Sequence, residues 1–154
     1  MIILFFGQPA SGKTTLAEHY IKLCTDSSKS NNYIHIDGDR WRAITQNVNY
    51  SKEGRLSNLK SAFDMAIFLE QEGFTPVLSF VTPYIELRQY LHDKSSCLIQ
   101  IYLKYNEDRG RNSYFATDFE EATGEYLLLD TSSCSIVDCL TKIMEYVEEK
   151  STCL

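Results

Sequence analysis

Two kinds of segment alternate along the chain: short apolar runs, and longer stretches in which apolar residues recur at helical spacing. Short apolar runs predict buried strands, whereas apolar residues three and four positions apart predict amphipathic helices. We expect strands over residues 2–6, 33–36, 77–80, 97–103 and 126–129. We expect helices over about residues 13–24 and 52–72, and a third from Ile136 through Val147, with Ser135 and Asp138 as its capping box.

Strands that alternate with helices are typical of a parallel sheet joined by crossover helices. The pattern therefore predicts an α/β fold: a doubly wound parallel sheet of about five strands, in three layers with helices on both faces. A chain of 154 residues that is 44% hydrophobic fits one domain over residues 1–154. Ligands of such sheets bind beyond the carboxyl ends of the strands, so candidate chemistry is sought there.

The segment between the first strand and the first helix matches the complete phosphate-loop pattern G-x-x-x-x-G-K-[ST]. It reads Gly7-Gln8-Pro9-Ala10-Ser11-Gly12-Lys13-Thr14 and is followed by Thr15. In such a loop the backbone N–H groups wrap phosphates, Lys13 reaches the β- and γ-phosphates, and Thr14 offers its hydroxyl to Mg²⁺. A glycine turn that matches by accident is the alternative, but the strand before it and the helix after it are the required context. We predict a nucleoside triphosphate site in a P-loop kinase fold.

Two carboxylates stand at the end of the second strand, Asp37 and Asp39, separated by a glycine. In a phosphoryl-transfer site, Asp37 can hold a water on Mg²⁺ while Asp39 accepts the proton of the attacking hydroxyl. A turn or a helix cap is the plainer interpretation of the same residues. Arg40 and Arg42 follow at once, and their guanidinium groups suit a second anionic group unless they only begin a solvated helix.

The composition of the chain limits the kinds of binding partner and the cellular compartment that we expect. A net charge of −6 and a pI near 5.0 disfavour a polynucleotide partner, which usually needs a basic stripe. The cysteines are odd in number and lack C-x-x-C spacing, which suits a reducing cytosol. They are Cys24, Cys97, Cys134, Cys139 and Cys153. The first apolar run is too short for a signal peptide, and no later run reaches membrane-spanning length. We therefore expect a cytoplasmic protein without a membrane partner.

Three further motifs follow the phosphate loop in order. They read Asp37-Gly38-Asp39-Arg40-Trp41-Arg42, then Tyr50-Ser51-Lys52-Glu53-Gly54-Arg55-Leu56-Ser57-Asn58, then Phe80-Val81-Thr82-Pro83-Tyr84. The adenylylsulfate kinase family shows Asp-Gly-Asp-Asn-x-Arg, Phe-Ser-x-x-Asp-Arg-x-x-Asn and Phe-Ile-Ser-Pro-Tyr in the same order. Over most of residues 1–104 the chain resembles that family in order and spacing, and more weakly afterwards.

The resemblance implies an enzyme that transfers the γ-phosphoryl group of ATP to the ribose 3′-hydroxyl of a nucleotide carrying an activated small acid. Lys13 and Asp39 then match the catalytic residues, and Thr14 and Asp37 hold Mg²⁺. The implied substrate-binding residues also include Arg42, Tyr50, Arg55, Asn58, Phe80, Val81 and Thr82. Of these, Arg42, Arg55 and Asn58 would hold the phosphate and acid groups. Tyr50 would stack on the acceptor base, although core packing is the plainer interpretation of Tyr50 and Phe80.

The chain departs from the family at several positions. Arg40 replaces Asn and Gly54 replaces Asp, and the segment 107–119, where the family has a longer lysine-rich lid, contains no lysine. Arg109 and Arg111 are candidates to clamp ATP phosphates or lie on adenine, and Phe115 to close over the acceptor, with a solvated loop as the alternative. Family members are often dimers, so the resemblance also leaves a homodimer open.

The acceptor itself stays open between two nucleotides. Adenylylsulfate is the family default, and cytidine diphosphoramidate is the acceptor of relatives that act in capsule modification. Other classes fit less well. A non-kinase switch of the GTPase type needs D-x-x-G and Asn/Thr-Lys-x-Asp elements, which the chain lacks. A nucleotide-binding module without turnover would predict the loss of Asp39, and a polynucleotide end kinase a basic groove.

Overall fold

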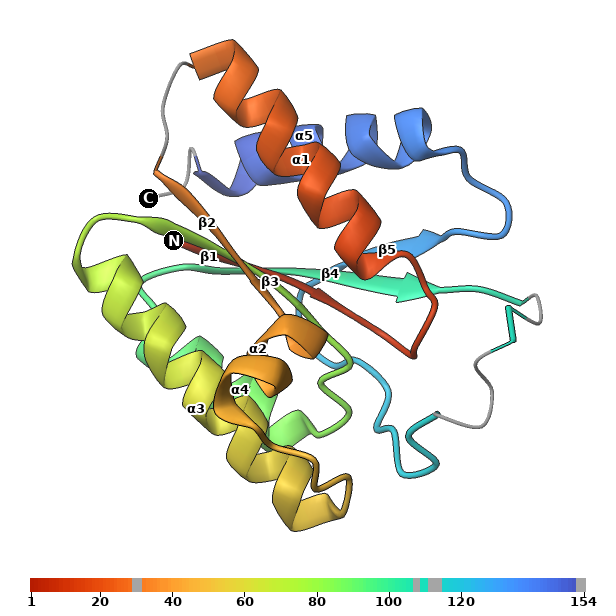
Figure 1. The fold of residues 1–154 in the computed structure, drawn as a ribbon. Helices are drawn as coiled ribbons and strands as arrows, with labels where there is room; N and C mark the ends of the chain where they lie inside the picture. Colours follow the sequence, from red (N-terminus) through yellow and green to blue (C-terminus); the bar gives the residue numbers. More distant parts are fainter. Residues whose placement is uncertain (29–31, 107–108, 111–114, 152–154) are drawn as a thin grey trace.

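The computed structural model describes residues 1–28, 32–106, 109–110 and 115–151. Within these residues, five strands form one sheet in which every neighbouring pair is parallel. The strands are β1 (Ile2–Phe6), β2 (Tyr33–Asp37), β3 (Thr75–Phe80), β4 (Leu98–Lys104) and β5 (Leu127–Asp130). Their order across the sheet is β2-β3-β1-β4-β5, so the strand that leads into the phosphate loop lies at the centre (Figure 1).

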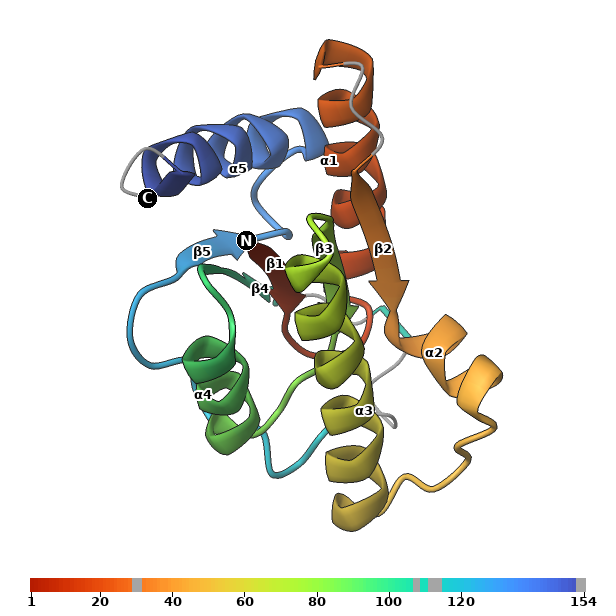
Figure 2. The same cartoon turned by 90° about the vertical axis from the view of Figure 1, so that its left-hand side faces the viewer.

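Helices cover both faces of the sheet. On one face lie α1 (Lys13–Ser28) and α5 (Ile136–Ser151); on the other lie α3 (Lys52–Gln71) and α4 (Ile85–Lys94) (Figures 1 and 2). The short helix α2 (Gly38–Thr45) continues from the carboxyl end of β2. The predicted three-layer, doubly wound parallel sheet is therefore confirmed.

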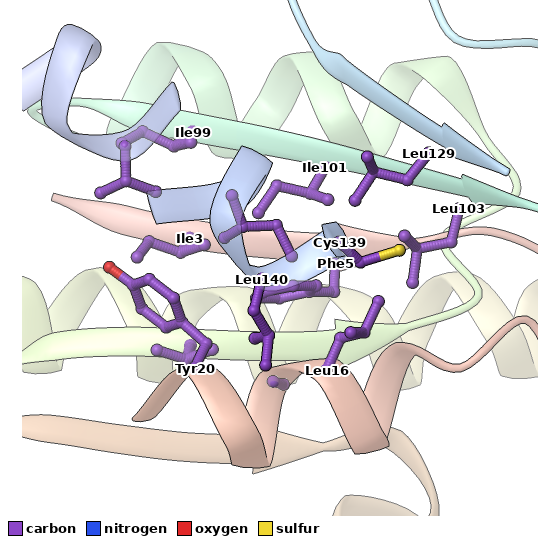
Figure 3. Close-up of a cluster of buried hydrophobic side chains, with 14 of the residues drawn as sticks. Ile3, Phe5, Leu16, Tyr20, Ile99, Ile101, Leu103, Leu129, Cys139 and Leu140 are labelled. Carbon is purple, nitrogen blue, oxygen red and sulfur yellow. The ribbon is translucent and has the colours of Figure 1, made fainter. Parts of the chain in front are cut away.

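Alternation along β1 divides the apolar core into two clusters. Successive side chains of a strand point to opposite faces. Ile3 and Phe5 accordingly pack with α1 and α5, in the cluster that Figure 3 shows, while Ile2, Leu4 and Phe6 pack with α3 and α4. All five residues of β1 are buried, as expected for a central strand with helices on both sides.

The predicted helices and strands are all present, with ends that differ by a few residues. At the start of α5, Ser135 Oγ accepts from the Asp138 N–H at 3.1 Å and donates to the Asp138 carboxylate, which is the predicted capping interaction. None of the helices in the described part of the chain is both long and apolar enough to cross a bilayer.

Two helices were not predicted, and each lacks the apolar stripe that the prediction relies on. Helix α2 has only eight residues and none of them is buried, so it is too short for a hydrophobic period to mark it. In α4 the inward face consists of Leu87, Arg88 and Leu91, and the buried arginine interrupts the apolar pattern. Both helices are held by polar contacts rather than by an amphipathic face alone.

Candidate active site

The phosphate loop turns sharply between β1 and α1, and its two glycines are required there. Gly7 has φ +142° and Gly12 has φ +91°, conformations that residues with a Cβ rarely adopt. A Cβ on Gly7 would also lie 2.2 Å from the carbonyl oxygen of Leu103. The loop can therefore run against β4 only because position 7 has no side chain.

Four consecutive backbone carbonyl groups of the loop each accept a hydrogen bond from a side chain. The pairs are Lys13 Nζ to Gln8 O at 2.7 Å, Tyr105 Oη to Pro9 O at 2.7 Å, Arg109 Nη1 to Ala10 O at 3.0 Å, and Thr131 Oγ1 to Ser11 O at 3.1 Å. A planar peptide holds each carbonyl opposite the next N–H group. Because the Pro9 and Ser11 carbonyls bind side chains from outside the loop, we expect the opposed amides of Ala10 and Gly12 to serve the anion cradle.

The Asp37 carboxylate links the phosphate loop to the ends of β2 and β3. Its Oδ2 accepts hydrogen bonds from Thr14 Oγ1 and from Ser79 Oγ, both at 2.8 Å. Its Oδ1 accepts the backbone N–H groups of Asp39 at 3.1 Å and Arg40 at 3.2 Å, so Asp37 also caps α2. Asp37 therefore has both of the roles considered from the sequence: it caps a helix, and it contacts the phosphate loop.

These contacts fix the charge of the carboxylate. Burial disfavours the ionised form, but hydrogen bonds from Thr14, Ser79 and the Arg40 amide outweigh it, so the pKa of Asp37 lies below its usual value. Neighbouring His35 donates to or accepts from Ser79 Oγ at 2.9 Å, and burial lowers its pKa against the opposing charges of Asp37 and Glu18. An ionised Asp37 beside the Thr14 hydroxyl presents two oxygen ligands of the kind that Mg²⁺ prefers.

A cleft of about 1170 Å³ opens over the phosphate loop and extends to α2 and α3. It brings together most of the residues that the sequence singled out. These are Pro9, Ala10, Gly12, Lys13, Thr14, Thr15, Asp37, Asp39, Arg42, Tyr50, Arg55, Asn58, Phe80, Val81 and Thr82. Asp39 lies in the first turn of α2, exposed to solvent at the wall of this cleft. Gln8 lies beside the cleft, with its side chain turned toward residue 116.

The wall opposite the phosphate loop consists of α2, the connection to α3, and the start of α3. The guanidinium of Arg42 lies 4.4 Å from the centre of the Tyr50 ring, and its Nη1 donates to Asn47 and Asn49 at 3.1–3.2 Å. Arg55 donates from Nε to the Tyr50 carbonyl at 3.1 Å. The Tyr50 ring is 61% exposed, so the structure excludes core packing as its reason for being there.

The turn after β3 has two unusual features. Thr82 adopts φ +44°, in the left-handed region that β-branched residues rarely enter. Its buried hydroxyl finds no hydrogen-bond partner in the part of the chain that the structure describes. An unpartnered hydroxyl in a cleft wall is a natural contact for a polar ligand. Phe80, by contrast, is buried and packs edge-on against Phe63 with ring centres 6.3 Å apart, so core packing accounts for most of its surface.

Two described residues of the segment that takes the place of the family lid, Arg109 and Phe115, lie near the phosphate loop. Arg109 binds Ala10 O and Thr131 and lies over the Tyr105 ring at 4.7 Å, which places it beside the loop. Phe115 contacts Tyr105 edge-on at 6.1 Å rather than standing among the cleft residues. Arg111 lies outside the described residues.

Sequence reasoning missed Ser79, Tyr105 and Thr131. Ser79 is paired in register with Asp37 across β2 and β3, a match visible only once the strand order is known. Tyr105 and Thr131 follow β4 and β5, so the rule that ligands lie at carboxyl ends of strands pointed to the right region without naming them. The described residues contain no cluster of three or more His, Cys, Asp or Glu side chains able to hold a metal.

Comparisons with known proteins identify the family of this chain. The family model described as adenylylsulphate kinase matches residues 1–113. The adenylyl-sulfate kinase of Halothermothrix orenii is 26% identical, over 96% of this chain and 89% of its own length. The cytidine diphosphoramidate kinase of Campylobacter jejuni is 29% identical, over 67% of this chain and 59% of its own length.

Among solved structures, the APS kinase CysC of Mycobacterium tuberculosis in complex with AMPPNP and APS superposes with a TM-score of 0.80. The two chains are 17% identical and 96% of each is covered, so this similarity bears on the fold. The family match spans most of the chain and includes the phosphate loop, both aspartates and the turn after β3. The chain therefore belongs to the adenylylsulphate kinase family and is an enzyme of the kinase class.

Proposed function

We propose that this protein transfers the γ-phosphoryl group of ATP to the ribose 3′-hydroxyl of adenylylsulfate. The observation that carries the proposal is the single cleft that joins the phosphate loop to Asp37, Asp39 and Arg42. Phosphoryl transfer involves little covalent chemistry by the protein, so catalysis consists mainly of positioning and charge neutralisation. A cleft that joins a triphosphate cradle to an acidic pair and a cationic wall supplies both.

The donor half binds the triphosphate of ATP. Backbone amides of residues 7–14 surround the phosphates, and Lys13 exchanges its contact with Gln8 O at 2.7 Å for the γ-phosphate. Thr14 and, through a water, Asp37 are the residues that would hold Mg²⁺. An ion held there would supply charge neutralisation at the transferring group.

The acceptor half orients and activates the attacking hydroxyl. Asp39 accepts the hydroxyl proton, since its carboxylate is exposed at the cleft wall on the first turn of α2. Arg42 and Arg55 bind the phosphate and acid groups of the acceptor. Guanidinium groups suit both because each presents several donors in a fixed plane. Tyr50 stacks on the acceptor base, and its 61% exposure leaves a ring face available.

An ADP-release assay over a panel of acceptors tests the proposal. The panel contains adenylylsulfate, cytidine diphosphoramidate, free nucleotides and simple sugars, each supplied with Mg·ATP. We expect strong turnover with adenylylsulfate and background with the others. If ADP release stayed at background with every acceptor, the proposed transfer would be excluded. If simple sugars were phosphorylated instead, the acceptor would be a sugar and not a nucleotide.

Cytidine diphosphoramidate is the second candidate acceptor, and it uses the same chemistry. Two observations favour it: the 29% identity to the Campylobacter jejuni cytidine diphosphoramidate kinase, and the lysine-free segment 107–119. In that case the pyrimidine would take the place of the purine beside Tyr50. Preference for this compound in the same assay would select it over adenylylsulfate.

A further inference from the structure

Residues 115–121, which we call the strut, run from the phosphate loop to the turn after β3. They are drawn in cyan in Figure 1, near the carboxyl ends of the strands. Ala116, close to the first end, is only 3% exposed. Thr117, Asp118, Glu120 and Glu121 are exposed, so the strut lies on the surface and is anchored at Ala116, and it forms no helix or strand.

At the donor end, the strut is held by the side chain of Gln8. Its Nε2 donates to Ala116 O at 3.0 Å, and its Oε1 accepts the Ala116 N–H at 3.1 Å. One amide side chain thus satisfies both backbone groups of one residue, as a neighbouring strand would. The two residues are 108 positions apart in the sequence.

At the acceptor end, the strut is held by the turn after β3 and by Arg88 of α4. The buried Arg88 guanidinium donates to Thr82 O at 2.7 Å, to Glu120 O at 2.9 Å and to Glu121 O at 3.0 Å. The Glu120 N–H in turn donates to Pro83 O at 2.8 Å. One cation therefore joins the strut to Thr82, the cleft residue with φ +44°.

Position 8 is unspecified in the phosphate-loop pattern, because phosphate binding there uses backbone amides. Any side chain would serve for that purpose. The paired hydrogen bonds to Ala116 give the glutamine side chain a different use. They place the strut in contact with the segment that would surround a triphosphate.

We propose that Gln8 is a positioning residue that couples the phosphate loop to the acceptor wall through the strut. Occupation of the loop then steadies residues 115–121, and through Arg88 it steadies Thr82. The benefit for transfer rests on the proposed function, but the coupling itself requires only that the loop and the strut respond together. Gln8 acts through Ala116 and is not assigned to the chemistry.

Hydrogen–deuterium exchange on the full chain tests the coupling, with and without Mg·AMP-PNP as the probe. Gln8→Met keeps the length of the side chain and removes both hydrogen bonds. Loss of two such bonds corresponds to about a tenfold change in a local opening equilibrium. Without nucleotide, we expect exchange in residues 115–121 to be about tenfold faster in Gln8→Met than in the wild type. Gln89→Met, which removes the single contact of Gln89 with Asp93 on α4, is the matched control and should change nothing in the strut.

The nucleotide arm separates coupling from a purely structural contact. In the wild type, AMP-PNP should slow exchange both in residues 7–16 and in residues 115–121. In Gln8→Met it should still protect residues 7–16 and leave 115–121 unchanged. An equal response of the strut in both proteins would overturn the proposal, as would no response in the wild type while the loop is protected.

Failure of the proposed function gives a different result. If AMP-PNP protected neither segment in the wild type, the assignment of ATP as donor would fail, and the nucleotide-free comparison would still decide the role of Gln8. If exchange in residues 115–121 were the same in Gln8→Met and the wild type without nucleotide, the proposed role of Gln8 would be overturned. Gln8→Ser, which is polar but too short to reach Ala116, carries the same expectation if Gln8→Met does not fold.

Discussion

The two halves of the cleft differ in how completely their polar groups are satisfied. On the donor side, Ser11, Lys13 and Asp37 are all buried, and each makes hydrogen bonds within the protein. On the acceptor side, Tyr50 is 61% exposed and Val48 is 85% exposed. The buried Thr82 hydroxyl of that wall finds no partner among the described residues.

This difference indicates which half of the cleft has its binding geometry before a ligand is present. A buried network with every member bonded holds one geometry, because leaving any member unpaired costs its desolvation energy. An exposed apolar rim and an unpaired hydroxyl gain only when a ligand covers them. The donor half is therefore preorganised for phosphates, whereas the acceptor half acquires its contacts with the substrate. The following changes test that division, from the largest expected effect to the smallest.

Lys13→Ala should cause the largest loss. The ammonium group is the only cationic side chain of the phosphate-loop motif, and removing a preorganised charge from a transferring group costs on the order of 10³-fold in turnover. Thermal unfolding should show a folded protein. Turnover within a factor of ten of the wild type would contradict the assignment of Lys13.

Asp39→Asn should reduce turnover by on the order of 10²-fold or more, because the amide cannot accept the hydroxyl proton. The KM for ATP should change little, since Asp39 lies on the acceptor wall. Steady-state kinetics with the accepted substrate measure both. Near-normal turnover would remove Asp39 as the base and make Asp37 the next candidate.

Asp37→Ala should destabilise the fold as well as the site. It removes the cap of α2 and leaves the Thr14 and Ser79 hydroxyls without their acceptor, at a cost of about 2–4 kcal/mol. The pKa of Asp37 is lowered in the folded state, so its stabilisation is present above the ordinary aspartate value of about 4. It is lost as the pH falls through the lower folded pKa.

Urea unfolding of the wild type and Asp37→Ala at pH 7 and near pH 3 checks this sign. The difference in the free energy of unfolding should be full at pH 7 and smaller near pH 3. A difference that grows on acidification would mean that the carboxylate is not held ionised by its hydrogen bonds.

Tyr50→Ala should raise the KM for the acceptor by about tenfold through lost base stacking, and leave the KM for ATP within about twofold. Stability should be nearly unchanged because the ring is exposed. Ile44→Ser, which alters an exposed apolar residue of α2 that does not line the cleft, is the control and should leave both KM values unchanged. Equal changes in the two KM values would assign Tyr50 to the shape of the wall instead.

Phe115→Ala should have the smallest effect, a rise of several-fold in the acceptor KM that exceeds any rise for ATP. Phe115 begins the strut, which Arg88 and Pro83 join to the turn after β3, so its contribution to acceptor binding is indirect. An effect of the same size on both substrates, or no effect on either, would assign Phe115 to packing.

Local patterns predicted most of the architecture. Strands β1 to β5 have apolar runs, and α1, α3 and α5 have the periodicity of amphipathic helices. Helices α2 and α4 escaped prediction because one buries nothing and the other buries an arginine. Arg88 is tolerated inside because it donates to three backbone carbonyls, two of which belong to a segment 32–33 residues away. No local pattern contains that information.

The sequence by itself determined the donor half of this protein. A phosphate loop is contiguous, so its glycines, lysine and threonine are readable from their spacing, and the two aspartates follow the next strand. Tertiary structure alone decided which side chains join that loop to the rest: Ser79 on Asp37, Thr131 on Ser11, and Gln8 on Ala116. Hydrogen bonds act over about 3 Å regardless of separation along the chain, so only the strand order brings such pairs within reach.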